Sequence, residues 1–267
     1  MRIVILTLNH IYSNKILKGL ISKYTEEIKL IIEPSSQLKG RTKLGGIFHY
    51  LKVSGLYYVL IQGIKLGTYL ILSAIHSFLG INNDNKFYGY HKLAKLNKIK
   101  IKKFADINSK KAVAEIKRLK PDLIISVLFS HIIKKEIIDV PALGVINIHP
   151  SFLPNYKGVS PIFWCLLNEE KHVGVTVHYI DEGIDSGPII YRRKIKVTRL
   201  DTEDTLYWKC VREGENLLEA AILDISKKRV KTLTNLGGKY YSFPTSKAVN
   251  RFRAKGKSFV NFKDYLC

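Results

Sequence analysis

Cysteines are few in this sequence. Cys165, Cys210 and Cys267 are three in number and stand far apart along 267 residues. Such a spacing shows neither a disulfide framework nor a thiolate zinc site. The histidines also lack the spacing of metal ligands. We therefore predict that the protein has no metal site and works in a reducing, cytoplasmic setting.

Long uninterrupted apolar runs are also scarce. The N-terminal residues MRIVILTLNH form a short apolar run without a small-residue cleavage site, which predicts a first strand and not a signal peptide. The apolar stretch 55–80 is interrupted by Gln62, Lys65 and His76. A spanning helix needs about 20 mostly apolar residues, and a central lysine is costly there. We therefore expect no stable membrane insertion, and we interpret 44–80 as a helical insertion that packs on the domain or pairs two subunits as a homodimer.

Acidic residues are half as frequent as basic ones. The 22 Asp and Glu against 44 Lys and Arg leave a net charge of +22, while 46% hydrophobic residues exclude a disordered chain. The excess has three interpretations: a solvated lysine-rich surface, attraction to anionic small molecules, or attraction to nucleic acid or anionic lipid. Charge alone does not choose among them.

Apolar runs typical of strands alternate with helical patterns along the chain. Runs at 2–8, 28–32, 122–128 and 143–148 predict buried strands, and Ser109 is the expected N-cap of an amphipathic helix ending at Leu119. This order predicts an α/β fold with a mostly parallel twisted sheet flanked by helices. Residues 1–200 form the expected main domain. Residues 201–267 predict a long helix, at 201–228, and a β-hairpin, at 230–243, as a small C-terminal extension.

Polar residues that can act on a carbonyl follow one of these strands. Asn147 and His149 stand two residues apart at the end of a buried strand, so their side chains project to the same side. Asp185 lies in the glycine-containing loop 181–187. Ligands of open parallel sheets bind at the carboxyl ends of strands. An amide that donates to an oxyanion, a histidine that handles a proton and a carboxylate that orients it suffice for nucleophilic addition to a carbonyl.

The sequence of this region contains several short motifs in a fixed order. It reads NIHPSFLP from Asn147, then Lys157-Gly158 and Pro161, then GVT at 174–176 and DEGIDSGPI from Asp181. In order and spacing it resembles the 10-formyltetrahydrofolate-dependent formyltransferases, which include glycinamide ribonucleotide, methionyl-tRNA and sugar N-formyltransferases. The resemblance implies a Rossmann-like catalytic domain over 1–200. It also implies that Asn147, His149 and Asp185 are the catalytic residues.

The resemblance further implies 10-formyltetrahydrofolate as co-substrate, used without a metal. Two segments, 126–133 and 181–185, are then expected to hold its pterin end, with the candidate residues Phe129, His131, Ile132, Asp181 and Gly183. Candidate contacts to the acceptor substrate are His10, Ser151 and Lys157. Simpler interpretations stay open for some of these: an exposed turn for His131, a strand-end turn for His10 and a solvent-facing side chain for Lys157.

Two departures from the family bear on the acceptor amine. The turn after the first strand, Thr7 to Tyr12, has no glycine, which disfavours a backbone cradle for phosphate and hence the purine-pathway enzyme. The region after Arg199 is shorter than the β-barrel-like domain that methionyl-tRNA formyltransferases usually add. We therefore expect a nucleotide-linked amino sugar, as in O-antigen biosynthesis. The alternatives are charged initiator tRNA, contacted by lysine-rich faces, and a catalytically silent folate- or partner-binding module.

Overall fold

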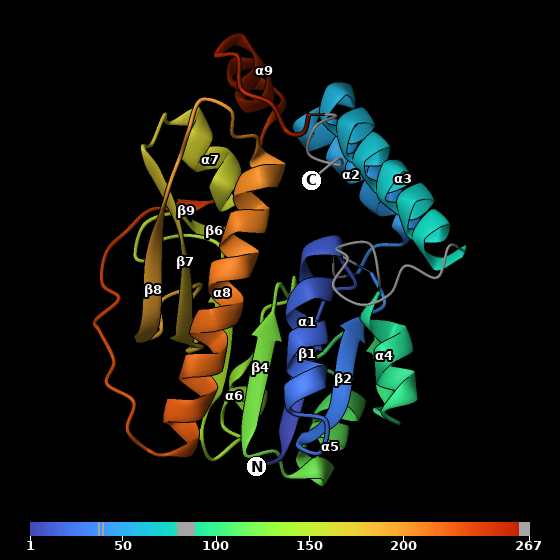
Figure 1. Cartoon of the computed structure of the whole chain (residues 1–267), viewed down its shortest axis with the longest axis vertical. Helices are drawn as coiled ribbons and strands as arrows, with labels where there is room; N and C mark the ends of the chain where they lie inside the picture. The colour runs from blue at the N-terminus through green and yellow to red at the C-terminus, as the bar shows by residue number, and fades with distance from the viewer. Residues whose placement is uncertain (37, 39, 79–88, 262–267) are drawn as a thin grey trace.

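A central sheet of seven strands organises the protein. The computed structural model describes all residues except 37, 39, 79–88 and 262–267 (Figure 1). The strand order is β3-β2-β1-β4-β5-β7-β8. The first five strands in that order are parallel, β7 is antiparallel to β5, and β8 is antiparallel to β7. The predicted mostly parallel sheet is thus confirmed; its strands are β1 (Ile3–Thr7), β2 (Ile28–Pro34), β3 (Ile101–Phe104), β4 (Leu123–Val127), β5 (Val145–His149), β7 (His172–Tyr179) and β8 (Ile189–Lys196).

Helices cover both faces of this sheet. Alternate residues of β1 show why: Ile3 and Ile5 belong to one buried cluster, and Val4 and Leu6 belong to the other. The first cluster is completed by α1 (Ile11–Lys23), α4 (Tyr90–Leu96), α7 (Pro161–Leu167) and α8 (Glu203–Ser226). The second is completed by α5 (Lys110–Leu119) and α6 (Lys135–Ile138). Strands buried on both faces read as continuous apolar runs, which is why they could be found in the sequence.

Helix ends follow the expected capping chemistry. The Ser109 hydroxyl accepts from the Ala112 N–H at 3.3 Å at the start of α5, as predicted. Pro161 is the first residue of α7, where its missing N–H costs nothing. Thr202 caps α8, and Glu203 and Asp204 occupy its first turn near the positive end of the helix dipole.

The segment 44–80 forms two helices, α2 (Lys43–Ser54) and α3 (Leu56–Phe78), and its last two residues lie outside the described part. Gly55 makes the turn between them with φ of 86°, in the region that favours glycine. Along one side α3 packs on the domain, where the Asn14 amide donates to the Tyr69 hydroxyl at 2.7 Å. Leu56–Ile75 is by length and composition apolar enough to cross a membrane, and only 11% of it is buried inside the protein. The packing role expected for this segment therefore holds for one side of α3 only.

The C-terminal extension lies against the main sheet. Its long helix α8 belongs to the same apolar cluster as β1, β5 and β7, and the division at residue 200 stays a prediction. In the region expected as a hairpin, Leu233 bridges to Ile189, and β9 (Tyr240–Tyr241) pairs in parallel with β6 (Lys157–Gly158). Its strand residues thus pair with distant segments of the chain. A further helix, α9 (Ser246–Ala254), follows and packs beside α2 (Figure 1).

Candidate active site

Strand β5 carries two of the predicted catalytic residues. It is the last parallel strand of the sheet, and its antiparallel register with β7 sets Asn147 opposite His178 and His149 opposite Thr176. Asn147 is half-buried and His149 is buried. Because the two residues are separated by one position in a strand, their side chains lie on the same face.

The loop after β7 brings the third residue to the same place. One carboxylate oxygen of Asp185, Oδ2, lies 3.7 Å from His149 Nδ1, and the other, Oδ1, lies 3.6 Å from His178 Nε2. The backbone N–H of Gly158 donates to Oδ2 at 2.8 Å. Asn147, His149 and Asp185 therefore form one cluster, joined through His178.

Asp185 is held as an anion. Burial raises its pKa, but the charge of His149, the hydrogen bond and charge of His178 and the Gly158 N–H together outweigh that effect. The net result is a pKa far below the usual range of an aspartic acid. The site thus keeps a permanent negative charge beside His149 at neutral pH.

The ring of His149 lies between two acceptors. Its Nε2 is 3.0 Å from the Tyr156 carbonyl oxygen, which can only accept, so Nε2 carries a proton. Its Nδ1 faces the Asp185 carboxylate, which also only accepts. Both ring nitrogens therefore lie near an acceptor, and the Nε2 contact holds the ring beside the Asn147 amide.

His178 is a site residue that the sequence analysis missed. Its Nδ1 donates to the Tyr179 carbonyl at 2.7 Å, and its Nε2 faces both Asn147 Nδ2 at 3.2 Å and Asp185 Oδ1 at 3.6 Å. An unprotonated Nε2 accepts one N–H of the Asn147 amide, and a protonated Nε2 donates to Asp185. In both states at least one N–H of the amide is left for a ligand. The partners of His178 come from a neighbouring strand and a loop, so spacing along the sequence does not indicate them. Pairing 173–180 with 143–148 would have revealed it.

Asn235 is a second missed residue, and it comes from the C-terminal extension. Its amide nitrogen donates to the carbonyl oxygens of Asp185 at 3.0 Å and Gly187 at 2.8 Å. The side chain is buried. Gly158, on the other side of the loop, has φ of 93°, and a Cβ there would stand 2.3 Å from the Tyr241 carbonyl oxygen. The position of Asp185 thus depends on the extension as well as on the main domain.

The residues predicted to hold folate lie on two loops that contact each other. Lys135 Nζ and Glu182 Oε1 are 3.6 Å apart, linking the segment after β4 to the loop after β7. Within the loops, Asp181 Oδ1 accepts from the Gly183 N–H at 3.1 Å, and the rings of Phe129 and His131 are 5.6 Å apart. His131 is buried near the Ser36 carbonyl, and Ile132 is 66% exposed. Their contact with folate stays a prediction.

The three residues predicted to contact the acceptor also have partners within the fold. Ser151 is fully buried and donates to the Asn155 carbonyl at 3.0 Å. His10 caps α1, and burial lowers its pKa to about 4, with Lys65 adding to the effect and Asp204 opposing it. Lys157 lies in β6 with Nζ 3.5 Å from the Asn235 carbonyl. Substrate contact by these residues remains a prediction, weakest for Ser151.

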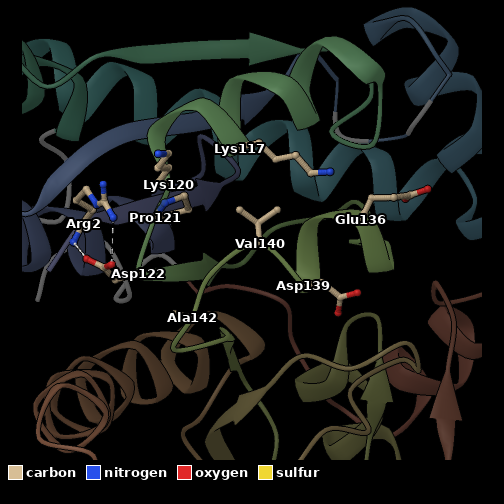
Figure 2. A pocket seen from close by; sticks show the side chains of 9 residues that line it. All are labelled: Arg2, Lys117, Lys120, Pro121, Asp122, Glu136, Asp139, Val140 and Ala142. Atoms are coloured by element: carbon tan, nitrogen blue, oxygen red, sulfur yellow. Dashed lines mark hydrogen bonds and ion pairs between the residues drawn. The ribbon is translucent and has the colours of Figure 1, made fainter.

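A hollow lies away from this cluster. A groove of about 460 Å³ is lined by residues at the amino ends of β1 and β4, among them Arg2, Lys120 and Asp122 (Figure 2). None of the predicted site residues lines it. Within the described residues no group of three or more His, Cys, Asp or Glu is placed to hold a metal ion. Burial raises the pKa of both described thiols, Cys165 and Cys210, so neither is a ready nucleophile.

Comparison with known proteins places this cluster in a family. Methionyl-tRNA formyltransferase of Halothermothrix orenii is 38% identical over 137 residues, which are 51% of this chain and 42% of that protein. Two solved structures match 99% of the chain: WlaRD, a sugar 3N-formyl transferase (TM-score 0.61, 22% identity, 81% of that structure), and an N-formyltransferase from Helicobacter canadensis (TM-score 0.62, 20% identity, 82% of that structure). The chain spans less than half the length of the curated relative. The model of the Formyl transferase family matches residues 71–222, more than half of the chain, and the chain therefore belongs to the formyl transferase family.

Proposed function

We propose that the protein transfers a formyl group from 10-formyltetrahydrofolate to a primary amine. The observation that carries this proposal is the cluster of Asn147, His149 and Asp185, which lies within the region matched by the family. Such a cluster combines a neutral amide donor, an imidazole between two acceptors and an anion, as attack of an amine on a formyl carbon requires.

The chemistry follows from these contacts. The amine nitrogen forms a bond to the formyl carbon, and the carbonyl oxygen becomes an oxyanion. This oxyanion accepts a hydrogen bond from an N–H of Asn147 and is stabilised by the positive charge of protonated His149. Asp185 holds His149 and helps to carry the proton that the attacking amine loses. When the bond between the formyl carbon and the folate nitrogen breaks, that nitrogen takes up a proton. The products are a formamide and tetrahydrofolate.

A nucleotide-linked amino sugar is the acceptor we favour. The likeness to WlaRD and to the Helicobacter canadensis enzyme extends over nearly the whole chain, including the extension that supplies Asn235. The first was solved with dTDP and 5-N-formyl-THF, and the second with folinic acid and dTDP-3-aminofucose. Charged initiator tRNA is the second candidate, because the methionyl-tRNA formyltransferase is a relative at 38% identity. A role in O-antigen biosynthesis and a cytoplasmic location are parts of the same proposal, and the homodimer stays a prediction from the sequence.

The test offers 10-formyltetrahydrofolate together with a panel of dTDP- and UDP-linked amino sugars, and separately with methionyl-tRNA, and follows release of tetrahydrofolate. We expect release with at least one amino sugar. The Asn147→Ala protein is the control for release that does not depend on the site. Release with tRNA alone, with binding that weakens steeply as salt is added, would overturn the sugar assignment. Absence of release with every acceptor would overturn formyl transfer to these classes.

A further inference from the structure

One side of α3 is an exposed apolar surface. Seven of its apolar side chains are each more than half exposed: Leu56, Leu60, Ile64, Leu66, Leu70, Ile71 and Phe78. Contiguous exposed apolar patches are limited in size on soluble monomers, and large ones mark sites of interaction with a protein or a membrane. A row of exposed apolar side chains along one helix therefore indicates a partner.

The lysine that interrupts this stretch in the sequence does not interrupt the surface. Lys65 is turned toward the domain, where its Nζ lies 2.6 Å from Asp204 Oδ1 on α8 and contacts the Tyr12 hydroxyl on α1. The lysine is 6% exposed. Since Lys65 is the only Lys, Arg, Asp or Glu in the sequence of α3, the described side chains on its exposed side carry none of these charges.

Among the described residues, the exposed charges of the neighbouring helices α2 and α9 are positive. None of the sequences of α2, α3 and α9 contains Asp or Glu. Lys52 on α2 and Lys247, Arg251 and Arg253 on α9 are exposed, and α9 packs beside α2 (Figure 1). The Arg253 guanidinium lies 3.9 Å from the centre of the Tyr57 ring, at the start of α3. An apolar surface with a cationic border is complementary to an anionic lipid bilayer.

We propose that the exposed side of α3 docks on an anionic membrane surface, with the helix lying flat and the cations of α2 and α9 among the lipid headgroups. A second copy of the chain would bring two positive borders together, which disfavours it as the occupant. Spanning the bilayer would break the Lys65–Asp204 pair and leave Asp204 buried without its cation. In Figure 1 the α2–α3 pair lies beyond the carboxyl ends of β1 and β4, at the end of the sheet where ligands bind.

The test is flotation of the full-length protein with vesicles of phosphatidylcholine alone or mixed with phosphatidylglycerol. We expect binding to the anionic vesicles, at least tenfold weaker binding to phosphatidylcholine, and loss of binding in high salt. The double variant Ile64→Glu/Ile71→Glu is expected to bind at least tenfold more weakly. Arg251→Gln should weaken binding by roughly fivefold. The matched control is Leu200→Glu, at an 88% exposed leucine outside these helices, which should bind like the unchanged protein.

Two results would overturn the proposal. One is the absence of flotation with either kind of vesicle. The other is a stable dimer, seen by light scattering, that Ile64→Glu/Ile71→Glu converts to monomers while vesicle binding is unaffected. Both replaced side chains are exposed, so circular dichroism should show a folded variant. None of these measurements depends on formyl transfer, and the docking proposal stands or falls separately from the proposed function.

Discussion

At the residue scale, Asn147 is the neutral donor of the cluster. Its amide nitrogen lies 3.2 Å from His178 Nε2, and in the proposed mechanism an N–H of the amide donates to the developing oxyanion. Asn147→Ala removes this donor, and loss of one oxyanion donor generally lowers kcat by on the order of a hundredfold or more. We expect that loss in steady-state formyl transfer, with an unfolding temperature close to that of the unchanged protein because the side chain is half-buried. A near-normal kcat would remove Asn147 from the catalytic set.

His178 is a positioning residue, since it acts through Asn147 and Asp185. Its hydrogen bond and charge help to lower the pKa of Asp185. In His178→Gln we expect kcat to fall by roughly tenfold and the pKa of Asp185 to rise, which moves the acid limb of the kcat/KM profile to higher pH. The measurement is the pH profile with a saturating formyl donor. A lower kcat with an unmoved acid limb would mean that His178 only supports the packing of β7.

These residues show how far the sequence could predict the site. Asn147 and His149 were predictable because a period-2 strand puts both on one face whatever surrounds them. Asp185 needed the family resemblance, since nothing local says that its loop folds back to His149. His178 and Asn235 depend on strand register and on contacts 31 and 50 residues away in the chain. Such long-range contacts leave no periodic signal in a single sequence.

At the element scale, the loop carrying Asp185 is held by the C-terminal extension. Asn235 donates two hydrogen bonds to loop carbonyls from a buried position. Asn235→Ala leaves both carbonyls without this donor, so we expect the free energy of unfolding to fall by about 1–3 kcal/mol and kcat to fall because Asp185 is less fixed. Urea denaturation and formyl transfer measure the two effects. The control is Asn250→Ala on the exposed side of α9.

An unchanged kcat in Asn235→Ala, with the expected loss of stability, would show that the extension stabilises the fold without ordering the site. A change in neither quantity would contradict the role given to these hydrogen bonds. The Asn250→Ala control should match the unchanged protein in both measurements.

Elements were predictable where burial shaped the sequence. The strands β1, β2, β4 and β5 are buried on both faces, and their apolar runs are continuous. Strand β3 has the sequence IKKF and lies at the edge of the sheet, where its lysines interrupt the apolar run. The sequence analysis therefore did not predict β3, and it also did not predict α4 and α9. Edge strands often carry lysine, which protects the edge from pairing with other chains. For the region 230–243 strand character was predictable from the sequence, but the segments with which its strand residues pair were not.

At the scale of the whole molecule, a buried charged cluster joins three helices. Tyr12 on α1 donates to Asp204 Oδ1 on α8 at 2.5 Å, and Lys65 on α3 pairs with the same oxygen at 2.6 Å. Glu203 lies next to Asp204 and is 4% exposed. Two adjacent buried carboxylates are costly unless cations compensate for both charges. The charge of Lys65 lowers the pKa of Glu203 and so favours its ionised form. The attachment of α3 to the domain therefore depends on pH.

The direction of that dependence follows from Glu203. Burial raises its pKa to about 7; Lys65 opposes the rise and Asp204 adds to it. The folded state binds this proton more tightly than the unfolded state, so protonation of Glu203 favours folding. Its contribution to the free energy of unfolding is complete below about pH 4.5 and is lost as pH rises to about 7. Glu203→Gln is neutral at every pH. Relative to the unchanged protein, it should raise the free energy of unfolding by about 1–3 kcal/mol at pH 8 and by almost nothing at pH 4.

Urea denaturation at pH 4, 6 and 8 measures this difference, and the matched control is Glu182→Gln, at an exposed carboxylate that should show no such trend. The difference has to grow with pH, since Glu203 becomes charged only as pH rises through about 7. If Glu203→Gln were less stable than the unchanged protein at pH 8, the ionised carboxylate would be stabilised inside the fold. In that case Lys65 would compensate for the charges of both Glu203 and Asp204, and the attachment of α3 to the domain would be most stable at high pH.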